Sequence, residues 1–518
     1  MADEVSPAKS ADRAWPVHPL FVATFPVLSV YSANVSLVPL HDLWRPLGVA
    51  LGGALAVWIV LLIPYRNLRR SAVATTVFCA LFLLYSIVGV RIGLDGFPWV
   101  WCFIALAAGV IASLFIRSTW FLNLAATLLV VMASGDIAIK EIRIAGEEAR
   151  IAREDQVATK ANAVQPDIIY MILDGYGRAD MLKRVMGFDN SPFTDGLQKR
   201  GFYVVPKSHS NYVQTEISLA SSLNMRLIPS LLPSLPRDTE DHSPFDKLIT
   251  TNSLAAFLRK QGYRTISITS GFPPIEFPNS DLWLRSATQL TLFEGSLLQM
   301  TPISEETDSG GSQFVWRRGA ILDTFKNLQD LSFPTPRPRF FFIHVLAPHP
   351  PFVFGPNGEV QPHHGPFGYW DGSDYMEYAG TPQTYRNGYV GQVQYLNKQV
   401  LATVDSLLKN AKTPPVIVIQ GDHGSKLRLD QSSLAKTDVT ECFQNLEALY
   451  VPQAVRAKLY PTLTPVNEFR IILDTLFGTK MPLLPDKSWY SPFPHPMEFT
   501  EVTDRIEVSQ ATAKPSAR

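Results

Sequence analysis

The sequence predicts a membrane-anchored α/β protein, with an N-terminal bundle of about five transmembrane helices followed by a domain with a mostly parallel central sheet. Two observations along the 518 residues predict this division. Long stretches without a charged residue fill positions 20–135, whereas short apolar runs alternate with amphipathic segments from Asp167 onward. The chain has 46 basic and 46 acidic residues. Because no positive charge is left over to neutralise phosphates, a nucleic-acid partner is not expected.

Five stretches of the N-terminal part are free of charge and long enough for a bilayer core, which takes roughly 20 residues of helix. They cover residues 20–40, 46–64, 71–90, 97–116 and 118–135. The first stretch contains Pro26, Asn34 and Pro39 and is the least apolar, so it can lie among the other helices instead of facing lipid. We therefore expect a transmembrane domain over residues 1–136, with the lipid bilayer as its partner.

Basic residues in the short loops predict the orientation of these helices, because cytoplasmic loops are enriched in Lys and Arg. With the N-terminus inside and five spans, the Arg-rich loop 66–70 and Arg117 face the cytoplasm, and only Arg45 and Arg91 face outward. An odd number of spans then places the rest of the chain on the extracytoplasmic, periplasmic side of an inner or plasma membrane. Four spans would put the Arg-rich loop outside, which the same rule disfavours.

Residues 137–164 connect the two parts and mix Ile and Ala with Lys, Glu and Arg at near-helical spacing. This pattern predicts an amphipathic linker helix along the membrane surface, and a plain solvated connector is the alternative. We place the second domain at residues 165–499 and a flexible tail at residues 500–518.

Four apolar runs predict the strands of the second domain. They cover residues 168–173, 265–269, 340–346 and 415–420. Continuous apolar runs of this kind are typical of strands buried on both faces of a parallel sheet. Helical periodicity over residues 251–261 and 384–408 predicts helices packed against that sheet. Sheets of this type bind ligands beyond the carboxyl ends of their strands.

Three of the four runs lead into residues that bind metals or carry protons. Asp174 follows the first run, His344 and His349 accompany the third, and Asp422 and His423 follow the last. An Asp-Gly pair at a strand end is most often a turn. The adjacent carboxylate and imidazole of Asp422 and His423, with a glycine on each side, favour two ligands for Zn²⁺ or Mn²⁺.

Thr215 opens a predicted helix and is the candidate nucleophile. Thr at this position often only caps the helix. A hydroxyl beside the free amides of a helix N-terminus also suits attack on an anionic phosphoryl centre. His349 is expected to contact the transferred group or to protonate the leaving oxygen, and His344 is a candidate substrate-binding residue.

Four motifs occur in a distinctive order and spacing: Leu173-Asp174-Gly175, Thr215 with a Ser-Leu-x-Ser tail, His349-Pro350-Pro351-Phe352 and Gly421-Asp422-His423-Gly424. The series resembles the alkaline phosphatase/sulfatase superfamily, and the five spans before it resemble the branch of lipoteichoic acid synthases and phosphoethanolamine transferases. The resemblance implies an alkaline-phosphatase-like α/β sandwich and a covalent phosphoryl intermediate on Thr215. It also implies one divalent metal ion, Zn or Mn, held by Asp174, Thr215, Asp422 and His423.

The implied activity is metal-dependent transfer of a phosphoglycerol or phosphoethanolamine type of group to an envelope lipid or glycan. A hydrolase of phosphate or sulfate esters would use the same residues with water as acceptor, and a non-catalytic partner in envelope polysaccharide assembly would keep only the fold. Sulfatases carry a Cys/Ser-x-Pro-x-Arg context that Thr215 lacks. The spacing Asp238-x-x-x-His242 is similar to a second ligand set in two-metal relatives, but it lies in a charged, Pro-rich segment and is predicted to be a solvated loop.

Overall fold

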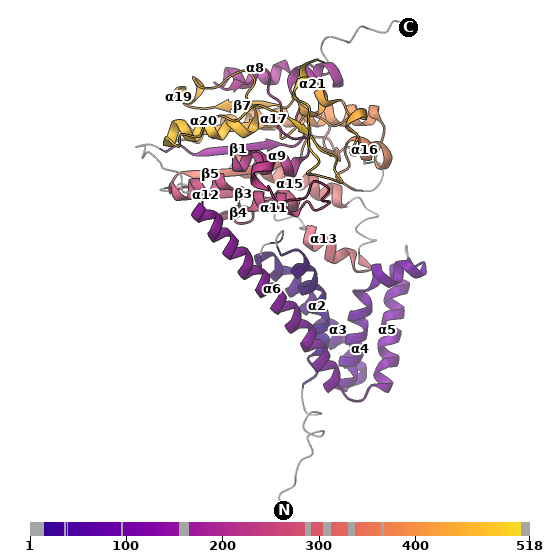
Figure 1. Cartoon of the computed structure of the whole chain (residues 1–518). Coiled ribbons are helices and arrows are strands. Elements are labelled where there is room, and N and C mark those ends of the chain that lie inside the picture. Colours follow the sequence, from indigo (N-terminus) through magenta and orange to yellow (C-terminus); the bar gives the residue numbers. More distant parts are fainter. Residues whose placement is uncertain are drawn as a thin grey trace, which may run out of the picture. The chain divides into compact units, whose positions relative to one another are not determined.

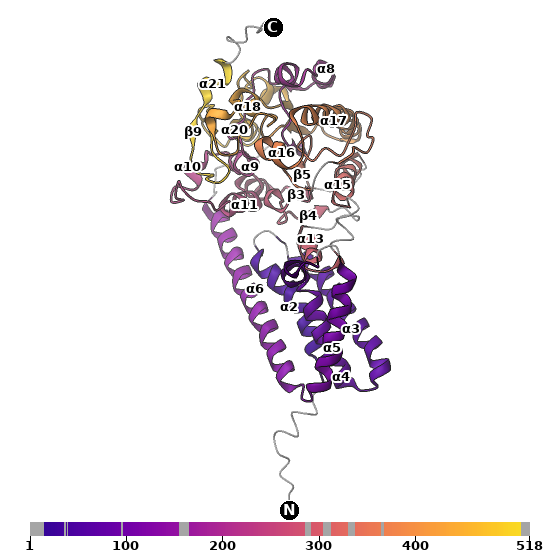
Figure 2. The same cartoon turned by 90° about the vertical axis from the view of Figure 1, so that its right-hand side faces the viewer.

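The computed structural model describes residues 15–35, 38, 40–94, 97–154, 165–284, 292–303, 312–329, 337–363 and 367–508. The chain divides into two compact units (Figures 1 and 2). The first unit comprises residues 1–148 and 290–312, and the second comprises residues 149–289 and 313–518.

Apolar helices build the first unit at the positions of the five predicted spans. They are α2 (His18–Ala33), α3 (Trp44–Tyr65), α4 (Leu68–Phe82), α5 (Pro98–Phe115) and α6 (Trp120–Glu154). In the described part of the chain, α3, α5 and the Trp120–Arg143 part of α6 are long and apolar enough to cross a membrane. α4 with Tyr85–Ile92, bent by 60°, makes a fourth if the pair is one span. α2 has 16 residues, which is shorter than the roughly 20 that a bilayer core takes.

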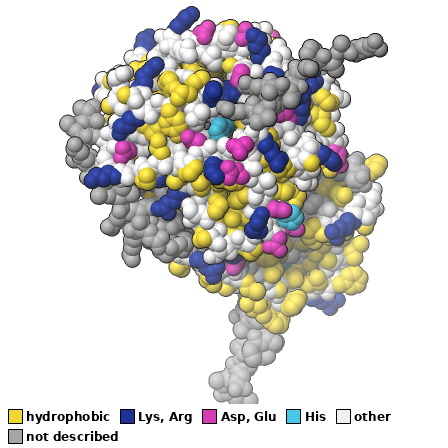
Figure 3. Space-filling model, turned by 45° about the horizontal axis from the view of Figure 1, so that its top comes forward, with side chains coloured by type: hydrophobic (Ala, Val, Ile, Leu, Met, Phe, Trp, Pro, Cys, Tyr) yellow, Lys and Arg dark blue, Asp and Glu magenta, His cyan; other side chains and the backbone are white. Residues whose placement is uncertain are grey.

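The first unit exposes large apolar side chains that a water-soluble domain would bury, among them Val60, Phe103 and Phe121. Figure 3 shows the contrast on one face of the molecule. Charged side chains are interspersed over the second unit, whereas apolar side chains crowd the helices of the first. The predicted N-terminal bundle of apolar helices is therefore confirmed, with three or four of them of spanning length among the described residues.

α6 runs without a break across the boundary predicted at residue 136. No proline interrupts the sequence between residues 120 and 154, so nothing forces the helix to end where its apolar part ends. The predicted linker covers residues 137–164. Its residues up to Glu154 are a continuation of α6, and residues 155–164 lie outside the described residues.

A segment from the second half of the sequence belongs to the first unit. Helix α13 (Leu292–Gln299) packs against α2. The Phe293 ring meets the Tyr31 ring edge to face, with centroids 5.9 Å apart. Glu294 forms an ion pair with Arg45. The second domain, predicted as continuous over residues 165–499, is therefore interrupted at residues 290–312.

A sheet of seven described strands forms the centre of the second unit, in the order β2-β7-β6-β1-β5-β3-β4. The strands are β1 (Ile168–Leu173), β2 (Tyr203–Val204), β3 (Arg264–Ile268), β4 (Leu282–Leu284), β5 (Arg339–Val345), β6 (Val416–Gln420) and β7 (Glu447–Tyr450). The five neighbouring strands β6, β1, β5, β3 and β4 are parallel, whereas β7 is antiparallel to both of its neighbours, β2 and β6. The four predicted apolar runs are β1, β3, β5 and β6, and the mostly parallel sheet is confirmed.

Helices cover both faces of this sheet (Figure 1). Successive residues of β1 point to opposite faces, so Ile169, Met171 and Leu173 join one core and the residues between them join the other. The first core packs under α8 (Ser191–Lys199), α15 (Ser312–Gln329) and α17 (Pro382–Asn410). The second packs under α9 (Thr215–Asn224), α11 (Ser243–Thr250), α12 (Ser253–Lys260) and α20 (Pro465–Phe477). Burial on both faces is the reason for the continuous apolar runs.

The C-terminal segment belongs to the fold up to Val508, so the flexible tail predicted from residue 500 is wrong over its first part. β9 (Thr500–Glu501) pairs with β8 (Trp489–Tyr490), and α21 (Thr503–Val508) packs against α18 (Val439–Phe443). Val502 and Ile506 lie one helical turn apart and are both buried, which gives this short segment an apolar face. Residues 509–518 lie outside the described residues.

Candidate active site

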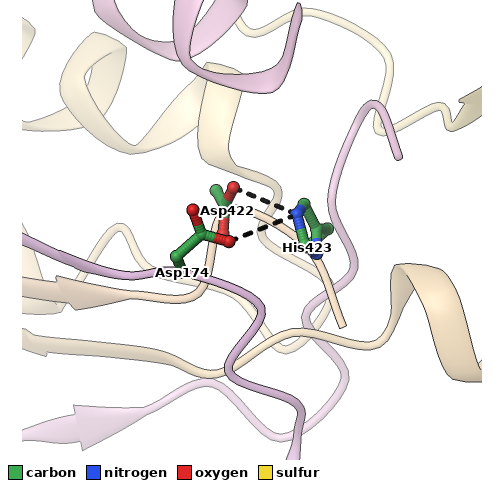
Figure 4. Close-up of side chains that lie close together, drawn as sticks. All are labelled: Asp174, Asp422 and His423. Carbon is green, nitrogen blue, oxygen red and sulfur yellow. Dashed lines mark ion pairs between the residues drawn. The ribbon is translucent and has the colours of Figure 1, made fainter. Parts of the chain in front are cut away.

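The carboxyl ends of β1 and β6 bring together three side chains that could hold a metal ion. The two strands are parallel neighbours, with Ile172 opposite Gln420, so the residues that follow them leave the sheet side by side. Ligand atoms of Asp174, Asp422 and His423 lie within 4.8 Å of one another (Figure 4). All three side chains are buried.

Glycines on both sides of the Asp422-His423 pair allow this close approach. A Cβ atom on Gly421 would lie 2.2 Å from the carbonyl oxygen of Tyr176, and one on Gly424 would lie 2.1 Å from the carbonyl oxygen of Glu441. Any side chain at either position would displace the loop from the neighbouring backbone. The glycines therefore set the position of the pair.

His423 presents an unprotonated nitrogen to the cluster. Its Nδ1 lies 2.8 Å from the carbonyl oxygen of Gly424, so Nδ1 carries the hydrogen and Nε2 is left with its lone pair. Nε2 lies 3.2 Å from Asp422 Oδ2 and 3.6 Å from Asp174 Oδ1. Burial lowers the pKa of His423, and the nearby charge of Asp422 only partly opposes this effect. The ring is therefore neutral at pH 7.

Thr215 is not the cap of α9. The cap residue is Gln214, and its side chain makes no capping hydrogen bond. The Thr215 hydroxyl instead lies 3.0 Å from His423 Nε2. The helix thus begins with uncapped backbone N–H groups next to a hydroxyl that faces the cluster.

Two carboxylate oxygens of the cluster lack a hydrogen-bond partner in the described part of the chain: Asp174 Oδ1 and Asp422 Oδ2. Bare carboxylate oxygens are costly to bury unless a cation lies beside them. With His423 Nε2 and the Thr215 hydroxyl, they make a set of three oxygens and one nitrogen that suits Zn²⁺ or Mn²⁺. The structure thus assembles all four residues of the predicted ligand set.

His344 lies inside the sheet edge, next to Asp174. It belongs to β5, and its Nε2 lies 3.2 Å from Asp174 Oδ2. Burial on its own would raise the pKa of Asp174, but the neighbouring His349, His344 and His423 outweigh it and hold that pKa well below the usual range. His344 is therefore placed to orient the Asp174 carboxylate, and its predicted contact with substrate stays a prediction.

His349 belongs to a second cluster, with two residues that the sequence analysis missed, Asp371 and Lys426. Asp371 Oδ2 lies 3.0 Å from His349 Nε2 and 2.9 Å from Lys426 Nζ. His349 Nδ1 lies 2.6 Å from the carbonyl oxygen of Pro350. Because both ring nitrogens face acceptors, the ring carries two protons. Burial lowers the pKa of His349, but Asp174 and Asp371 outweigh burial and raise it.

This second cluster has a surplus of positive charge. Burial lowers the pKa of Lys426, but Asp371, Asp174 and Asp422 together raise it, so Lys426 stays charged. Two cations then share the single carboxylate of Asp371. A buried positive cluster beside a metal-ligand set suits an anionic phosphoryl or sulfate group. Lys426 stands four positions after Asp422, a signal that sequence reading could have used, whereas Asp371 comes from a separate loop and carries no such signal.

Replacing Lys426 by Met is expected to destabilise the second unit by about 3 kcal/mol, because it breaks the buried ion pair with Asp371. Urea unfolding of the detergent-solubilised chain, followed by tryptophan fluorescence, measures the change. Adding Asp371→Asn to the variant should recover part of the loss. The matched control is Lys458→Met, which breaks the half-exposed pair with Asp474 and should cost under about 1 kcal/mol. Equal losses in the two Met variants would contradict the assignment.

The segment 238–242 does not supply a second ligand set. Asp238 is exposed, whereas His242 Nδ1 lies 2.6 Å from Glu216 Oε1 and its Nε2 lies 2.9 Å from the carbonyl oxygen of Phe493. Within the described ranges, the group formed by Asp174 and the Asp422-His423 pair is the one metal cluster found. The segment is a largely exposed loop, as predicted, and His242 at its end pairs with Glu216.

Asp246, next to this pair, predicts a pH dependence of stability. Burial and the charge of Glu216 raise the pKa of Asp246 from 3.8 to about 7. Since the folded-state pKa lies above the unfolded value, folding favours the protonated form, and stability falls as the pH rises from about 4 to about 7. Asp246→Asn removes this loss. Thermal unfolding at pH 5 and pH 8 should show a clearly larger gain for the variant at pH 8. An equal effect at both pH values would exclude Asp246 as the source.

Comparisons with known proteins identify the family of the second unit. The family model described as Sulfatase matches residues 166–441, just over half of the chain. No curated protein sequence matches the chain. Among solved structures, the C-terminal periplasmic domain of EcEptC from Escherichia coli is 13% identical, covering 68% of this chain and 98% of that one, with a TM-score of 0.43.

Two further solved structures illustrate the range of similar proteins. The integral membrane protein lipooligosaccharide phosphoethanolamine transferase A (EptA) from Neisseria meningitidis is 10% identical, covers 89% of this chain and 96% of that one, and has a TM-score of 0.37. The phosphonate monoester hydrolase SpPMH from Silicibacter pomeroyi is 14% identical, covers 60% of this chain and 73% of that one, and has a TM-score of 0.39.

Proposed function

The chain belongs to the Sulfatase family, and on this basis we propose that it is a membrane-anchored, metal-dependent transferase with a covalent intermediate on Thr215. The transferred group is of the phosphoglycerol or phosphoethanolamine type, and the acceptor is an envelope lipid or glycan. The observation that carries the proposal is the Thr215 hydroxyl, 3.0 Å from His423 Nε2 and beside two carboxylate oxygens without a partner among the described residues.

A divalent ion held by Asp174, Thr215, Asp422 and His423 would lower the pKa of the Thr215 hydroxyl and offset charge on the phosphoryl oxygens. With such an ion in place, the Thr215 hydroxyl would lose its proton to solvent before the reaction begins. Its Oγ1 then forms a bond to phosphorus, and the bond from phosphorus to the oxygen of the lipid donor breaks. The uncapped N–H groups at the start of α9 stabilise the anionic phosphoryl group on Thr215.

His349 and Lys426 act on the opposite side of the transferred group. His349 carries protons on both nitrogens, so it can give its Nε2 proton to the leaving oxygen while Asp371 keeps its bond to Lys426. In the second step the hydroxyl of the acceptor returns a proton to His349 and attacks phosphorus, which releases Thr215. Each proton and each bond is thereby restored after one turnover.

A hydrolase is the alternative, since water could replace the acceptor hydroxyl at the same residues. A non-catalytic assembly partner is disfavoured, because the chain keeps the candidate nucleophile and every candidate ligand together. Sulfate esters are disfavoured as substrates, because residue 215 is Thr where sulfatases need Cys or Ser. We also propose an extracytoplasmic location for the second unit, supported by the basic loops of the N-terminal helices.

Mass spectrometry of the peptide that carries Thr215 tests the proposal. Full-length protein is incubated with vesicles of phosphatidylethanolamine or phosphatidylglycerol and quenched in acid. We expect the mass of phosphoethanolamine or phosphoglycerol on Thr215, and no addition in Thr215→Val. Lipid cleavage without any modification of Thr215 would reject the covalent transferase and leave the hydrolase.

A further inference from the structure

A pocket beside the second cluster combines aromatic rings with neutral polar side chains. Its volume is about 230 Å³. Its rings include Phe352, Trp370 and Tyr375, and its polar side chains include Gln361, Thr384 and Asn387. Among the described residues of its lining, His363 is the one basic side chain, and no Asp, Glu, Lys or Arg occurs. The pocket is therefore built for a ligand that is uncharged, partly apolar and rich in hydrogen-bonding groups.

The pocket wall and the His349–Asp371 pair come from the same two chain segments. Pro350 and Pro351 of the wall directly follow His349, and Trp370 directly precedes Asp371. The pocket thus adjoins the residues to which we assign the proton on the leaving and attacking oxygens, where an acceptor has to bind.

The aromatic part of the wall is preformed. Phe352 packs closely against α17 because residue 388 is glycine, and a Cβ atom there would lie 2.2 Å from the ring. Tyr375, from α16 (Gly372–Tyr378), and Tyr385 pack against the same ring, with centroids 5.8 and 5.2 Å from it. Such a rigid aromatic surface binds a ligand with little loss of side-chain freedom.

Two amides of the wall have free bonding capacity, whereas the Thr384 hydroxyl is already bonded to Thr381. The Gln361 amide makes no hydrogen bond to another described residue. The Asn387 amide accepts one from Gln383 and keeps its own N–H groups available. Free amides on one side and ring faces on the other match a pyranose, whose C–H faces pack on aromatic rings while its hydroxyl edge bonds to amides.

We propose that this pocket binds a sugar ring of the acceptor, so that the group on Thr215 is handed to a sugar hydroxyl. The inference rests on the proposed transferase and narrows its acceptor from lipid or glycan to glycan. A cationic headgroup would favour a carboxylate in the wall, and a hydrocarbon chain would leave the amides without partners. The neutral, mixed lining favours the sugar over both.

The two half-reactions provide separate measurements. The first half-reaction, transfer of the phosphoryl group from lipid vesicles to Thr215 (charging), is followed by mass spectrometry. Discharge is followed with methyl glycosides of glucose, mannose and galactose as probes, against 1,3-propanediol, an acyclic alcohol. We expect at least one methyl glycoside to discharge Thr215 about tenfold faster than the diol at equal concentration, as one well-placed set of hydrogen bonds and ring contacts allows.

Variants of the pocket test its role. Asn387→Ala, at an exposed position of α17, and Trp370→Phe, which keeps a ring, should lower discharge by the glycoside about tenfold relative to Thr215 charging. Asn410→Ala, at the exposed end of the same helix, is the matched control and should change neither reaction. Equal discharge by glycoside and diol, or an equal loss in the control, would overturn the proposal.

The outcome also separates this inference from the proposed function. If Thr215 acquires the phosphoryl group but glycosides discharge it no faster than the diol, the sugar pocket is rejected and the transferase is not. If Thr215 never acquires the phosphoryl group, the transferase is rejected. In that case saturation-transfer NMR with the same glycosides still tests the pocket. Binding to the wild type that is lost in Asn387→Ala supports a sugar site, and absence of binding to the wild type rejects it.

Discussion

Thr215→Val is expected to lower release of diacylglycerol from phosphatidylethanolamine or phosphatidylglycerol vesicles by at least about a thousandfold, the scale of removing a catalytic nucleophile. Val has nearly the shape of Thr and lacks the hydroxyl, so α9 and the packing around it should persist. Thr215→Ser keeps the hydroxyl next to His423 Nε2 and should retain measurable activity. Diacylglycerol release by the purified full-length protein is the measurement.

The matched control is Thr475→Val on α20, where the hydroxyl bonds only to its own helix, at the carbonyl oxygen of Ile471. It should leave activity unchanged. If Thr215→Val kept more than about a tenth of the activity, catalysis would not pass through a covalent bond to Thr215, since loss of a nucleophile costs far more than that.

Removing divalent metal is expected to abolish activity and to lower the thermal stability of the second unit. Two buried carboxylate oxygens without partners among the described residues point toward one imidazole nitrogen, and a cation relieves their repulsion. At a free metal concentration a thousand times the dissociation constant, binding contributes about 4 kcal/mol to folding. Elemental analysis should find one Zn or Mn ion per chain, and thermal unfolding with and without chelator should show the loss.

Variants locate the ion within the chain. Asp422→Asn and His423→Ala should each lower the metal content and abolish the effect of the chelator. Asp246→Asn, which changes a buried carboxyl outside the cluster, is the matched control and should keep the ion. A wild-type protein that purifies without metal and gains no stability from added Zn²⁺ or Mn²⁺ would contradict the site.

The strands of the second unit and the meeting of its candidate metal ligands could be predicted because their signals are local. Strands buried on both faces must be apolar at every position, so β1, β3, β5 and β6 stand out in the sequence. Parallel strands end at the same edge of a sheet, so the residues after β1 and β6 could be expected to meet. The adjacent Asp422 and His423 were a metal signal by themselves.

Other features could not be predicted, because they depend on partners far apart in the chain. Asp371 joins His349 and Lys426 across separate loops. Residues 290–312 join the N-terminal helices through contacts such as Phe293 with Tyr31. His242 pairs with Glu216, although its own surroundings in the sequence are polar and rich in proline. None of these contacts has a periodic or local pattern.

The sequence by itself thus determined the two-part architecture, the parallel sheet and the identity of the metal-binding candidates, because apolar periodicity and residue type act over short distances along the chain. Only the tertiary structure decided what surrounds them. It determined which nitrogen of His423 is free, that Thr215 faces that nitrogen instead of capping its helix, and that a positive cluster and a neutral aromatic pocket adjoin the site. The physical reason is that each of these depends on hydrogen bonds, charges and ring contacts between segments that only folding brings together.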